Sequence, residues 1–346
     1  MPEILFPTSL SGEQSTSDEL ARMHASMLPD GVCSMVDLTA GLGVDAMTLA
    51  RVTGAHVVAV EREREVADAL VHNAAAMGVW IDVKCADCRD YLTALPDRVF
   101  DAAFIDPARR DARGLRVYGL ADCEPDVLQM LPLLRRKART LIVKMSPMLD
   151  VSQILRDLPV VNDLWALGSS TECKELVARC LLAEESGAMM GAEPRLHAVT
   201  SKGEFMFTPA DEVAASCGYG LPASEGWIYE PWPVVMKLAP WRLLAERFGM
   251  TQLHPNTHLY YSQERVDGFP GDGRRIIEVL PFSSSVIKRM PKRYPVMQVA
   301  TRNFPLTTDV LARKLHAREG HNAVRVIGAT VSPDVPSLIV LGDAAI

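Results

Sequence analysis

Acidic residues follow four short apolar runs near the start of this chain, where their carboxylates could hold a ligand. Asp37 ends the first run and Glu61 ends the second. Asp87 follows the third run, and Asp106 follows the fourth. In a parallel α/β sheet the carboxyl ends of the strands share one edge, and ligands bind at that edge. Carboxylates placed there can accept hydrogen bonds from ribose hydroxyls, from an exocyclic amine or from an ammonium group.

A glycine-rich turn separates Asp37 from a helix-like stretch that begins at Asp45. The turn contains Gly41 and Gly43, and the next apolar run ends on Glu61. Glycine lets the backbone approach a ligand closely, because no Cβ stands in the way. The order strand, glycine turn, helix, strand and acid is typical of the first unit of a doubly wound sheet that binds an adenosine-bearing cofactor.

Two kinds of cofactor are compatible with this turn. Gly41-x-Gly43-x-x-Ala46 also fits the dinucleotide fingerprint, so NAD is one candidate. Asp37 stands four positions before Gly41. Its carboxylate would repel a pyrophosphate and attract the cationic amino-acid end of S-adenosylmethionine. We therefore favour S-adenosylmethionine over NAD. A turn that binds nothing is a further alternative.

The second chemical motif is Asp106-Pro107-Ala108-Arg109, which directly follows the apolar run Phe100 to Ile105. Proline fixes its own φ and restricts the preceding residue to extended conformations. Asp106 would thus be held rigidly at the sheet edge, where it could orient an amine and accept its proton. Arg109 could hold phosphate or stack on a base plane. The alternative is a proline-stiffened turn with surface arginines.

Length and composition indicate a soluble globular protein of two or three domains. The chain has 346 residues, of which 48% are apolar and 23% are charged. No apolar run approaches the ~20 residues of a membrane span, and the N-terminus lacks the features of a signal peptide. We therefore expect a cytoplasmic protein with no membrane contact.

The cysteines predict neither disulfides nor a metal site. There are seven, scattered along the chain, and an odd number argues against a disulfide framework. Cys85-Ala-Asp-Cys88 is a C-x-x-C pair, but a zinc site would need a second pair at suitable spacing.

Positive charge is concentrated in one segment of an otherwise acidic chain. The whole chain carries −7, whereas residues 285–325 hold nine Lys or Arg against two acids. A basic C-terminal segment on an acidic protein predicts a local contact with a polyanion. A solvated basic surface is the alternative.

A helix is expected over residues 13–28, just before the first strand. Thr16 and Glu19 have the spacing of a capping box, and an apolar stripe follows them. The helix could cover the cofactor pocket or simply pack on the sheet edge.

The remaining pattern alternates between strands and helices up to residue 220 and then changes character, so we place a domain boundary there. The other elements that the periodicity predicts are helices over 63–77, 126–139, 234–249 and 310–317, and strands over 80–85, 100–105, 140–144, 195–200, 204–208, 258–262, 275–280, 323–328 and 338–341, with two more strands between 160 and 183.

Over nearly its full length the chain resembles a bacterial family of class I S-adenosylmethionine-dependent methyltransferases with a THUMP-like C-terminal domain. The motifs that carry the resemblance are Glu13-Gln14, Asp37-Leu-Thr-Ala-Gly-Leu-Gly-Val-Asp45, Asp106-Pro-Ala-Arg-Arg110, Lys144-Met-Ser-Pro147, Glu172-Cys-Lys-Glu175, Tyr229-Glu-Pro231, Asn256-Thr-His-Leu-Tyr260, Phe269-Pro-Gly271 and Arg302-Asn-Phe-Pro305. The resemblance implies an α/β fold, with a Rossmann-like methyltransferase sheet and helices on both faces, followed by small α+β domains that are ferredoxin-like and THUMP-like. We assign residues 1–220, 221–282 and 283–346 to these three parts.

The resemblance also implies S-adenosylmethionine as the cofactor. THUMP-type domains occur in RNA-modifying enzymes, so it implies an RNA substrate, tRNA or rRNA. The candidate cofactor residues are Asp37, Thr39, Gly41, Gly43, Asp45, Glu61 and Asp87. The candidate catalytic residues are Asp106, Pro107 and Arg109, and the candidate RNA-binding residues are Lys288, Arg289, Lys292, Arg293 and Arg302.

Specific roles follow for the acids at the strand ends. Asp37 is assigned to the amino-acid end of the cofactor, Glu61 to its ribose and Asp87 to its adenine. Asp106 is assigned to the acceptor, which it would orient and polarise.

Two departures from related motifs bear on the acceptor atom. Arg109 stands where Asp-Pro-Pro-Tyr-type N-methyltransferases carry the aromatic residue that stacks on the target base. Uracil-C5 methyltransferases need a nucleophilic cysteine after the next strand, where this chain has Met145-Ser146-Pro147. We therefore predict direct transfer to a base nitrogen. The alternatives are a nicotinamide enzyme, a non-catalytic RNA-binding protein that retains the fold, and a methyltransferase that acts on a small molecule or a protein.

Overall fold

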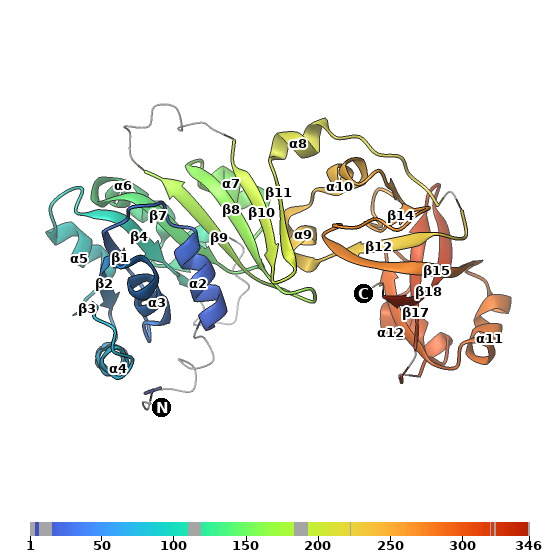
Figure 1. The fold of residues 1–346 in the computed structure, drawn as a ribbon, viewed down its shortest axis with the longest axis horizontal. Coiled ribbons are helices and arrows are strands. Elements are labelled where there is room, and N and C mark those ends of the chain that lie inside the picture. Colours follow the sequence, from blue (N-terminus) through green and yellow to red (C-terminus); the bar gives the residue numbers. More distant parts are fainter. Residues whose placement is uncertain are drawn as a thin grey trace. The chain divides into compact units, whose positions relative to one another are not determined.

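The computed structural model describes residues 4–6, 16–109, 119–182, 193–221, 223–318, 320–321 and 323–344. The chain divides into two compact units. The first contains residues 1–168 and 173–199, and the second contains residues 169–172 and 200–346. Figure 1 shows the helices and strands of both units, coloured along the chain.

The first unit is built on a mostly parallel sheet. Eight of the nine strands of this sheet lie in the first unit: β1 (Ser34–Asp37), β2 (His56–Glu61), β3 (Asp82–Cys85), β4 (Phe100–Ile105), β7 (Ala138–Met145), β8 (Val161–Gly168), β9 (Cys173–Leu181) and β10 (Arg195–Thr200). They lie side by side in the order β10-β8-β9-β7-β4-β1-β2-β3. Neighbours are parallel except at β9, which runs antiparallel to both β7 and β8. The doubly wound sheet predicted from the sequence is confirmed.

The chain reverses its direction of winding at β1, which has β2 on one side and β4 on the other. Asp37 pairs in register with Phe104, so Asp106 emerges two residues beyond that pair at the same edge of the sheet. In doubly wound sheets such a switch point is where ligands bind, outside the carboxyl ends of the strands. The fold therefore brings the two sequence motifs together.

Helices follow most strands of the first unit. The helices are α2 (Asp18–Ser26), α3 (Val44–Thr53), α4 (Arg64–Ala76), α5 (Cys88–Ala94), α6 (Val127–Lys137) and α7 (Val151–Asp157), with a 3-10 turn at Leu120–Asp122. Those over residues 44–53, 64–76 and 127–137 were predicted from the sequence, whereas those over 88–94 and 151–157 were not. A short ladder joins β5 (Ala108–Arg109) to β6 (Cys123–Glu124). Gly78, with φ +64°, follows the end of α4, as expected for a helix C-cap.

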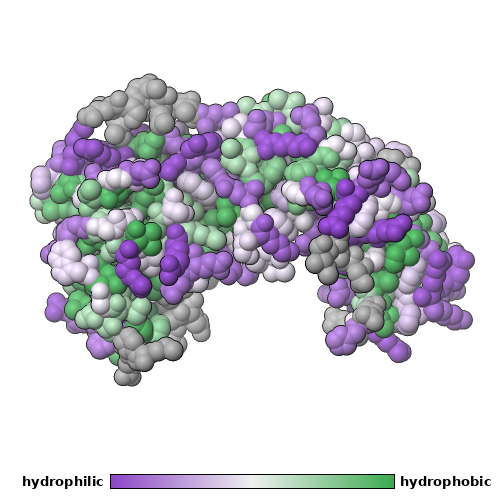
Figure 2. All heavy atoms as spheres, viewed as in Figure 1, coloured by the Kyte–Doolittle hydropathy of each residue, from purple (hydrophilic) through white to green (hydrophobic). Residues whose placement is uncertain are grey.

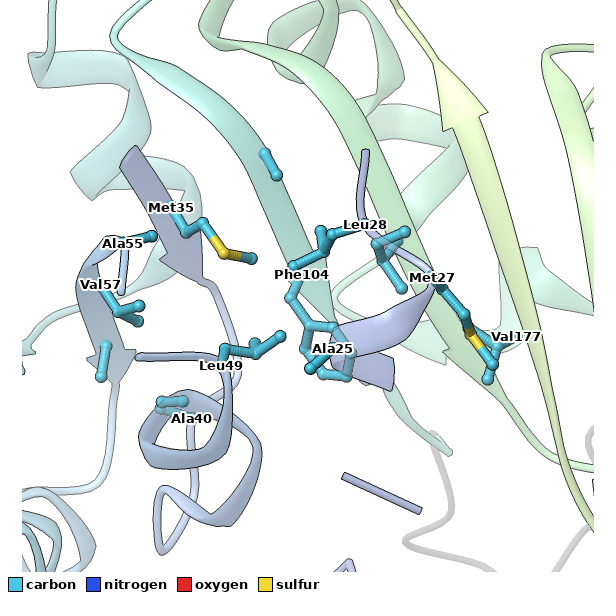
Figure 3. Packing of buried hydrophobic residues seen from close by; sticks show 14 of the residues in the cluster. Ala25, Met27, Leu28, Met35, Ala40, Leu49, Ala55, Val57, Phe104 and Val177 are labelled. Atoms are coloured by element: carbon cyan, nitrogen blue, oxygen red, sulfur yellow. The ribbon is translucent and has the colours of Figure 1, made fainter. Parts of the chain in front are cut away.

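Helices α2 and α3 pack on one face of the sheet around Phe104 of β4. Figure 3 shows Ala25, Leu28 and Leu49 next to the Phe104 ring. All four side chains are buried. Because this core includes residues from both helices and from β4, it fixes α2 over the strands that carry the two motifs.

Helix α2 begins later than the sequence predicts. Its N-cap is Ser17, whose Oγ accepts a hydrogen bond from the backbone N–H of Leu20. The predicted capping box of Thr16 and Glu19 is therefore wrong. The Thr16 hydroxyl instead donates to Oδ2 of Asp45 on α3 at 2.7 Å. Residues 13–15 lie outside the described part of the chain.

The second unit is a smaller α+β structure. Its elements are β11 (Gly203–Phe207), α8 (Pro209–Ala214), β12 (Trp227–Pro231), α9 (Pro233–Leu238), α10 (Trp241–Arg247), β13 (Thr251–Gln252), β14 (Tyr260–Ser262), β15 (Gly271–Pro281), α11 (Ser284–Arg293), β16 (Met297–Arg302), α12 (Thr308–Lys314), β17 (Val324–Val331) and β18 (Val335–Ala344). Seven of the strands form a sheet in the order β13-β14-β12-β15-β18-β17-β16. Buried residues of α11 and α12 share one core with β16, β17 and β18.

The predicted helix over residues 234–249 is two helices, α9 and α10. Ala239 has φ +63°, outside helical geometry, and Pro240 has no backbone N–H to donate. The helix α11 and the strand β16 are present although the sequence pattern did not predict them. Pro291 lies in the last turn of α11, so it removes a hydrogen bond only near the helix end.

Candidate active site

The glycine turn between β1 and α3 has backbone angles that favour glycine. Gly41 has φ +52°, and Gly43, the N-cap of α3, has φ +81°. A Cβ on Gly43 would lie 1.9 Å from Cδ1 of Leu70, so this glycine is also required for packing against α4. A Cβ on Gly41 would meet no described atom within 4 Å. The turn therefore leaves space at Gly41.

Asp37, at the end of β1, is almost completely buried, with 1% of its surface exposed. Its Oδ1 accepts a hydrogen bond from the backbone N–H of Thr39 at 3.1 Å. Burial raises the pKa of Asp37 well above its usual value, and the nearby carboxylates of Asp45 and Asp106 raise it further. A cation placed beside Asp37 would reverse part of this shift, because it would stabilise the ionised carboxylate.

Thr39 ties the end of β1 to the second motif. Its hydroxyl oxygen accepts a hydrogen bond from the backbone N–H of Asp106 at 2.7 Å. One short side chain therefore connects the residues that follow β1 and β4. This contact explains why a threonine, with its hydroxyl on a stiff β-branched side chain, serves at this position.

Glu61 and Asp87 both bind backbone N–H groups of their own edge of the sheet. Oε2 of Glu61 accepts from Gly41 at 3.0 Å, and Oε1 accepts from Glu63 at 2.8 Å. Oδ1 of Asp87 caps α5 by accepting from Arg89 and Asp90. Each carboxylate keeps lone pairs for a further donor, because an ionised carboxyl has about four acceptor sites.

Asp106 follows β4, and 39% of its side chain is exposed. Its Oδ2 accepts a hydrogen bond from the Lys144 ammonium group at 2.7 Å. Burial raises the pKa of Asp106, Lys144 lowers it, and the net shift is upward. Pro107 is buried, and the backbone of Ala108 and Arg109 forms β5. The side chain of Arg109 lies outside the described residues.

The same region contains a closed ring of hydrogen bonds and ion pairs that the sequence did not predict. The Lys144 ammonium donates to Oγ1 of Thr16 at 2.9 Å, and Thr16 donates to Oδ2 of Asp45 at 2.7 Å. Oδ1 of Asp45 lies 2.7 Å from Nδ1 of His24, and Nε2 of His24 lies 2.6 Å from Oε1 of Glu175. Oε2 of Glu175 lies 4.0 Å from Lys144, which closes the ring.

Charges alternate around this ring. Burial alone lowers the pKa of His24, but hydrogen bonds to Asp45 and Glu175 outweigh burial and raise that pKa to about 9. His24 is therefore an imidazolium at neutral pH, and both of its nitrogens donate. Burial likewise lowers the pKa of Lys144, and Asp106, Asp45 and Glu175 raise it above its usual value. Two cations thus alternate with the anions Asp45 and Glu175.

His24, Lys144 and Glu175 are site residues that the sequence interpretation missed. Lys144 and Glu175 stand inside motifs that carry the family resemblance, but no role was assigned to them. His24 lies on the apolar side of α2 and is completely buried. A histidine on an apolar helix face was the available signal, because a buried imidazole needs hydrogen-bond partners on both nitrogens.

The predicted RNA-binding residues belong to the second unit. Lys288, Arg289, Lys292 and Arg293 are all exposed on α11, and Figure 2 shows hydrophilic side chains gathered over this helix. Arg293 pairs with Glu278 at 2.9 Å. Arg302, at the end of β16, is different in kind, because its guanidinium donates to Glu230 at 3.0 Å.

The described residues also bear on metals and membranes. Among them, no group of three or more His, Cys, Asp or Glu could hold a metal ion. In the same described part of the chain, no helix is long and apolar enough to cross a membrane.

The solved structures that resemble this chain include a relative that matches it over almost its whole length. It is a protein from Porphyromonas gingivalis W83 described as a putative methyltransferase. The two share 31% sequence identity with a TM-score of 0.88, and the match covers 98% of this chain and 84% of the other. Family models match residues 227–270 as a ferredoxin-like domain and residues 273–342 as a THUMP domain-like region. No curated protein matches the sequence.

Partial matches include an RNA methyltransferase from Salinibacter ruber in complex with S-adenosyl-L-homocysteine and a tRNA (uracil-54, C5)-methyltransferase from Pyrococcus abyssi, also in complex with S-adenosyl-L-homocysteine. The first shares 15% identity over 49% of this chain and 94% of the other, with a TM-score of 0.35. The second shares 18% identity over 47% of this chain and 37% of the other, with a TM-score of 0.33.

Proposed function

This chain belongs to the family of class I S-adenosylmethionine-dependent methyltransferases that carry ferredoxin-like and THUMP-like domains at the C-terminus, and from that premise we propose that it methylates a nucleotide in RNA at a base nitrogen. The division into residues 1–220, 221–282 and 283–346 is part of this proposal. The two family models fall within the second and third of these ranges, apart from residues 273–282.

The observation that carries the proposal is the surplus of acid at the switch point of the sheet. The cations Lys144 and His24 are balanced by the ring anions Asp45 and Glu175. Asp37 and Asp106 then remain as two further carboxylates beside a glycine turn that leaves space at Gly41. Such a site favours a cationic ligand, and a pyrophosphate would be repelled.

S-adenosylmethionine fits this charge pattern, because it carries an ammonium group and a sulfonium. Among the described residues Asp37 forms no ion pair. Burial raises its pKa, the carboxylates of Asp45 and Asp106 raise it further, and Lys144 offsets only part of this shift. In the proposed complex Asp37 holds the ammonium group, with Thr39 and Asp45 beside it. Gly41 and Gly43, which have no Cβ, let the backbone of the turn lie close to the cofactor.

The remaining cofactor contacts come from the next two strands. Glu61 accepts hydrogen bonds from the ribose, and Asp87 accepts one from the exocyclic amine of adenine. Both side chains already bind backbone N–H groups, which holds them in fixed orientations. Fixed acceptors lose little conformational entropy when the ligand binds.

Bound S-adenosylmethionine supplies an activated methyl group, so the protein mainly has to align the acceptor. Asp106 accepts a hydrogen bond from the N–H of the target base and turns its nitrogen lone pair toward the methyl group. When the nitrogen is methylated it loses one proton, which Asp106 or water takes up. Pro107 keeps Asp106 extended at the strand end, and Arg109 contacts a phosphate or the base plane.

RNA as the substrate is supported by the second unit. Residues 273–342 match a THUMP domain-like model, and the exposed face of α11 carries Lys288, Arg289, Lys292 and Arg293. Contacts between these cations and phosphates would release counterions, so binding should weaken as salt rises. Arg302 completes the proposed RNA-binding set.

The proposal is tested by mass spectrometry of modified nucleosides in total RNA from a strain that lacks the gene and from its parent. We expect one N-methylated nucleoside to disappear and to return with the wild-type gene. It should not return with Asp106→Ala, although the variant still binds RNA. If no methylated nucleoside changes, and the purified protein transfers no tritiated methyl group to RNA from the deletion strain, RNA is not the substrate.

The cofactor is tested separately by isothermal titration with S-adenosylhomocysteine and with NAD. We expect heat from the first and none from the second. Tight binding of NAD would contradict the proposal and favour a nicotinamide enzyme.

A further inference from the structure

Asp106 is the only member of the site whose carboxylate is both linked to the buried ring and substantially exposed. Its side chain is 39% exposed, whereas that of Lys144 is 12% exposed. The exposed fractions are 0% for His24, 11% for Asp45 and 7% for Glu175. Lys144 is therefore the connection between the enclosed ring and the group proposed to meet the acceptor.

The position of the Lys144 ammonium is set from several sides. It donates to Oδ2 of Asp106 and to Oγ1 of Thr16, and Glu175 lies 4.0 Å away. A lysine ammonium has three donors and a flexible stem, so it adopts one place only when its neighbours fix it. Thr16 and Glu175 are themselves held by Asp45 and His24, so the ammonium has little freedom to move.

The ring would be electrically balanced without Asp106. Lys144 and His24 offset Asp45 and Glu175, so neutrality does not require a fifth charged residue. The shorter contact of Lys144 is nevertheless with Asp106, at 2.7 Å, and not with Glu175. Of the two carboxylate oxygens of Asp106, Oδ2 accepts a hydrogen bond from Lys144, whereas Oδ1 accepts none from the described residues.

We propose that Lys144 is a positioning residue for Asp106: it occupies Oδ2 and keeps the carboxylate ionised, so that Oδ1 is left to accept a hydrogen bond from the acceptor N–H. The assignment of an N–H acceptor rests on the proposed function, whereas the coupling of Lys144 to Asp106 does not. A carboxyl with one oxygen fixed can rotate little, which orients the hydrogen bond that the other oxygen receives.

The test replaces Lys144 and measures the titration of Asp106 directly. The protein is labelled with ¹³C-aspartate, and the carboxyl signal of Asp106 is assigned with Asp106→Asn. In Lys144→Gln, which keeps hydrogen-bonding groups but removes the charge, we expect the Asp106 midpoint to rise by ~1–3 pH units. The pH profile of kcat/KM, measured for methyl transfer to RNA from the deletion strain, should show the same change: the apparent pKa of its acidic limb should rise by the same number of pH units.

Lys137→Gln is the matched control. Lys137 is also a buried lysine with a carboxylate partner, since its side chain is 3% exposed and its ammonium lies 3.0 Å from Asp97. It is not part of the ring. We expect Lys137→Gln to lower the melting temperature but to leave the Asp106 midpoint and the acidic limb where they are in the wild type.

An unchanged Asp106 midpoint in Lys144→Gln would overturn the proposal, as would an equal change in both variants. If Lys144→Gln does not fold, the test is a pH titration of the wild type. The NMR signal of Lys144 Nζ should then shift with the same midpoint as the Asp106 carboxyl signal. An Nζ signal that does not shift at that midpoint would contradict the proposal. If the wild type methylates no RNA, the proposed function fails, and the two titrations still decide whether Lys144 controls Asp106.

Discussion

Asp37 illustrates at the scale of one residue how a binding site can cost stability. The folded protein holds this carboxyl in a buried place, where burial raises its pKa well above the usual value. Between the unfolded pKa of ~3.9 and the raised folded pKa, the folded state binds more protons than the unfolded state. Stability of the cofactor-free protein should therefore fall as pH rises through that range, and ligand binding should become tighter over the same range.

Asp37→Asn should raise the melting temperature of the cofactor-free protein at neutral pH and weaken the binding of S-adenosylhomocysteine by ~10–100-fold. The amide still accepts the N–H of Thr39 but cannot ionise, and a hydrogen bond between charged groups is worth roughly 1.5–3 kcal/mol. Thermal melts and isothermal titration measure the two effects. Asp126→Asn, at a buried helix cap, is the control that should leave the affinity unchanged. Unchanged affinity in Asp37→Asn would remove Asp37 from the binding site.

His24 predicts a loss of stability at high pH. Its pKa is raised from the usual value of 6.5 to about 9, so its contribution is fully present below 6.5 and disappears as pH rises through 9. The full effect is roughly 3 kcal/mol, from the linkage of pKa to free energy. Denaturant melts between pH 6 and pH 10 should show this loss in the wild type. In His24→Gln the loss should shrink, and an identical loss in both proteins would contradict the prediction.

The residues of the site were predictable to different degrees. Asp37 and Asp106 could be found because each ends an apolar run, and the strand order brings such ends together. His24, Lys144 and Glu175 come from a helix, a parallel strand and an antiparallel strand. Their meeting depends on tertiary packing, which local periodicity does not contain. The cap of α2 was misplaced by one residue, because Thr16 and Ser17 are both good N-cap residues.

At the scale of elements, α11 combines a buried face with a basic exposed face. Val286 and Met290 pack into a core, while Lys288, Arg289 and Lys292 are exposed. Changing these three residues to Gln should weaken binding to RNA from the deletion strain and reduce the slope of log affinity against log salt by about 2, at ~0.7 per phosphate contact. Filter binding at salt concentrations from about 50 to about 300 mM would measure the slope.

The control for α11 removes equal charge elsewhere. Arg51, Arg64 and Arg135 are exposed residues of the first unit, and their change to Gln should leave the salt slope unchanged. Equal losses in the two triple variants would mean that overall charge, and not α11, governs RNA binding.

Arg302 should behave differently from the α11 residues, because it joins strands. The Glu230 carboxylate on β12 accepts from Arg302 on β16 and from Arg325 on β17. Arg302→Gln should therefore lower the melting temperature, because a half-exposed ion pair contributes up to ~1 kcal/mol to the free energy of unfolding. Lys288→Gln should not. If Arg302→Gln leaves the melting temperature unchanged, Arg302 does not stabilise the fold, and its main role would be to bind RNA.

Elements of the first unit were more predictable than those of the second. Buried parallel strands such as β2 and β4 give continuous apolar runs, and the helices between them are regular. In the second unit a left-handed Ala239 splits one apolar stripe into α9 and α10. Pro291 hid α11, and β16 is a half-buried strand whose apolar and polar residues do not alternate strictly.

At the scale of the whole molecule, the chain divides into two compact units with separate cores. The core around Phe104 lies in the first unit, and two clusters that include Ile339 and Val340 lie in the second. All candidate cofactor residues belong to the first unit, whereas the family models match only the second. Ligand binding should thus stabilise the two units unequally.

Differential scanning calorimetry should show two transitions, of which S-adenosylhomocysteine moves only one. At a ligand concentration of 100 times Kd the stabilisation is ~2.7 kcal/mol, and for a unit of about 200 residues this corresponds to a shift of roughly 5–10 °C. Asp37→Asn should abolish the shift and leave both transitions visible. If both transitions move together, or only one exists, the two units unfold as one cooperative body. Binding of the ligand would then also stabilise the second unit, which contains the basic helix α11.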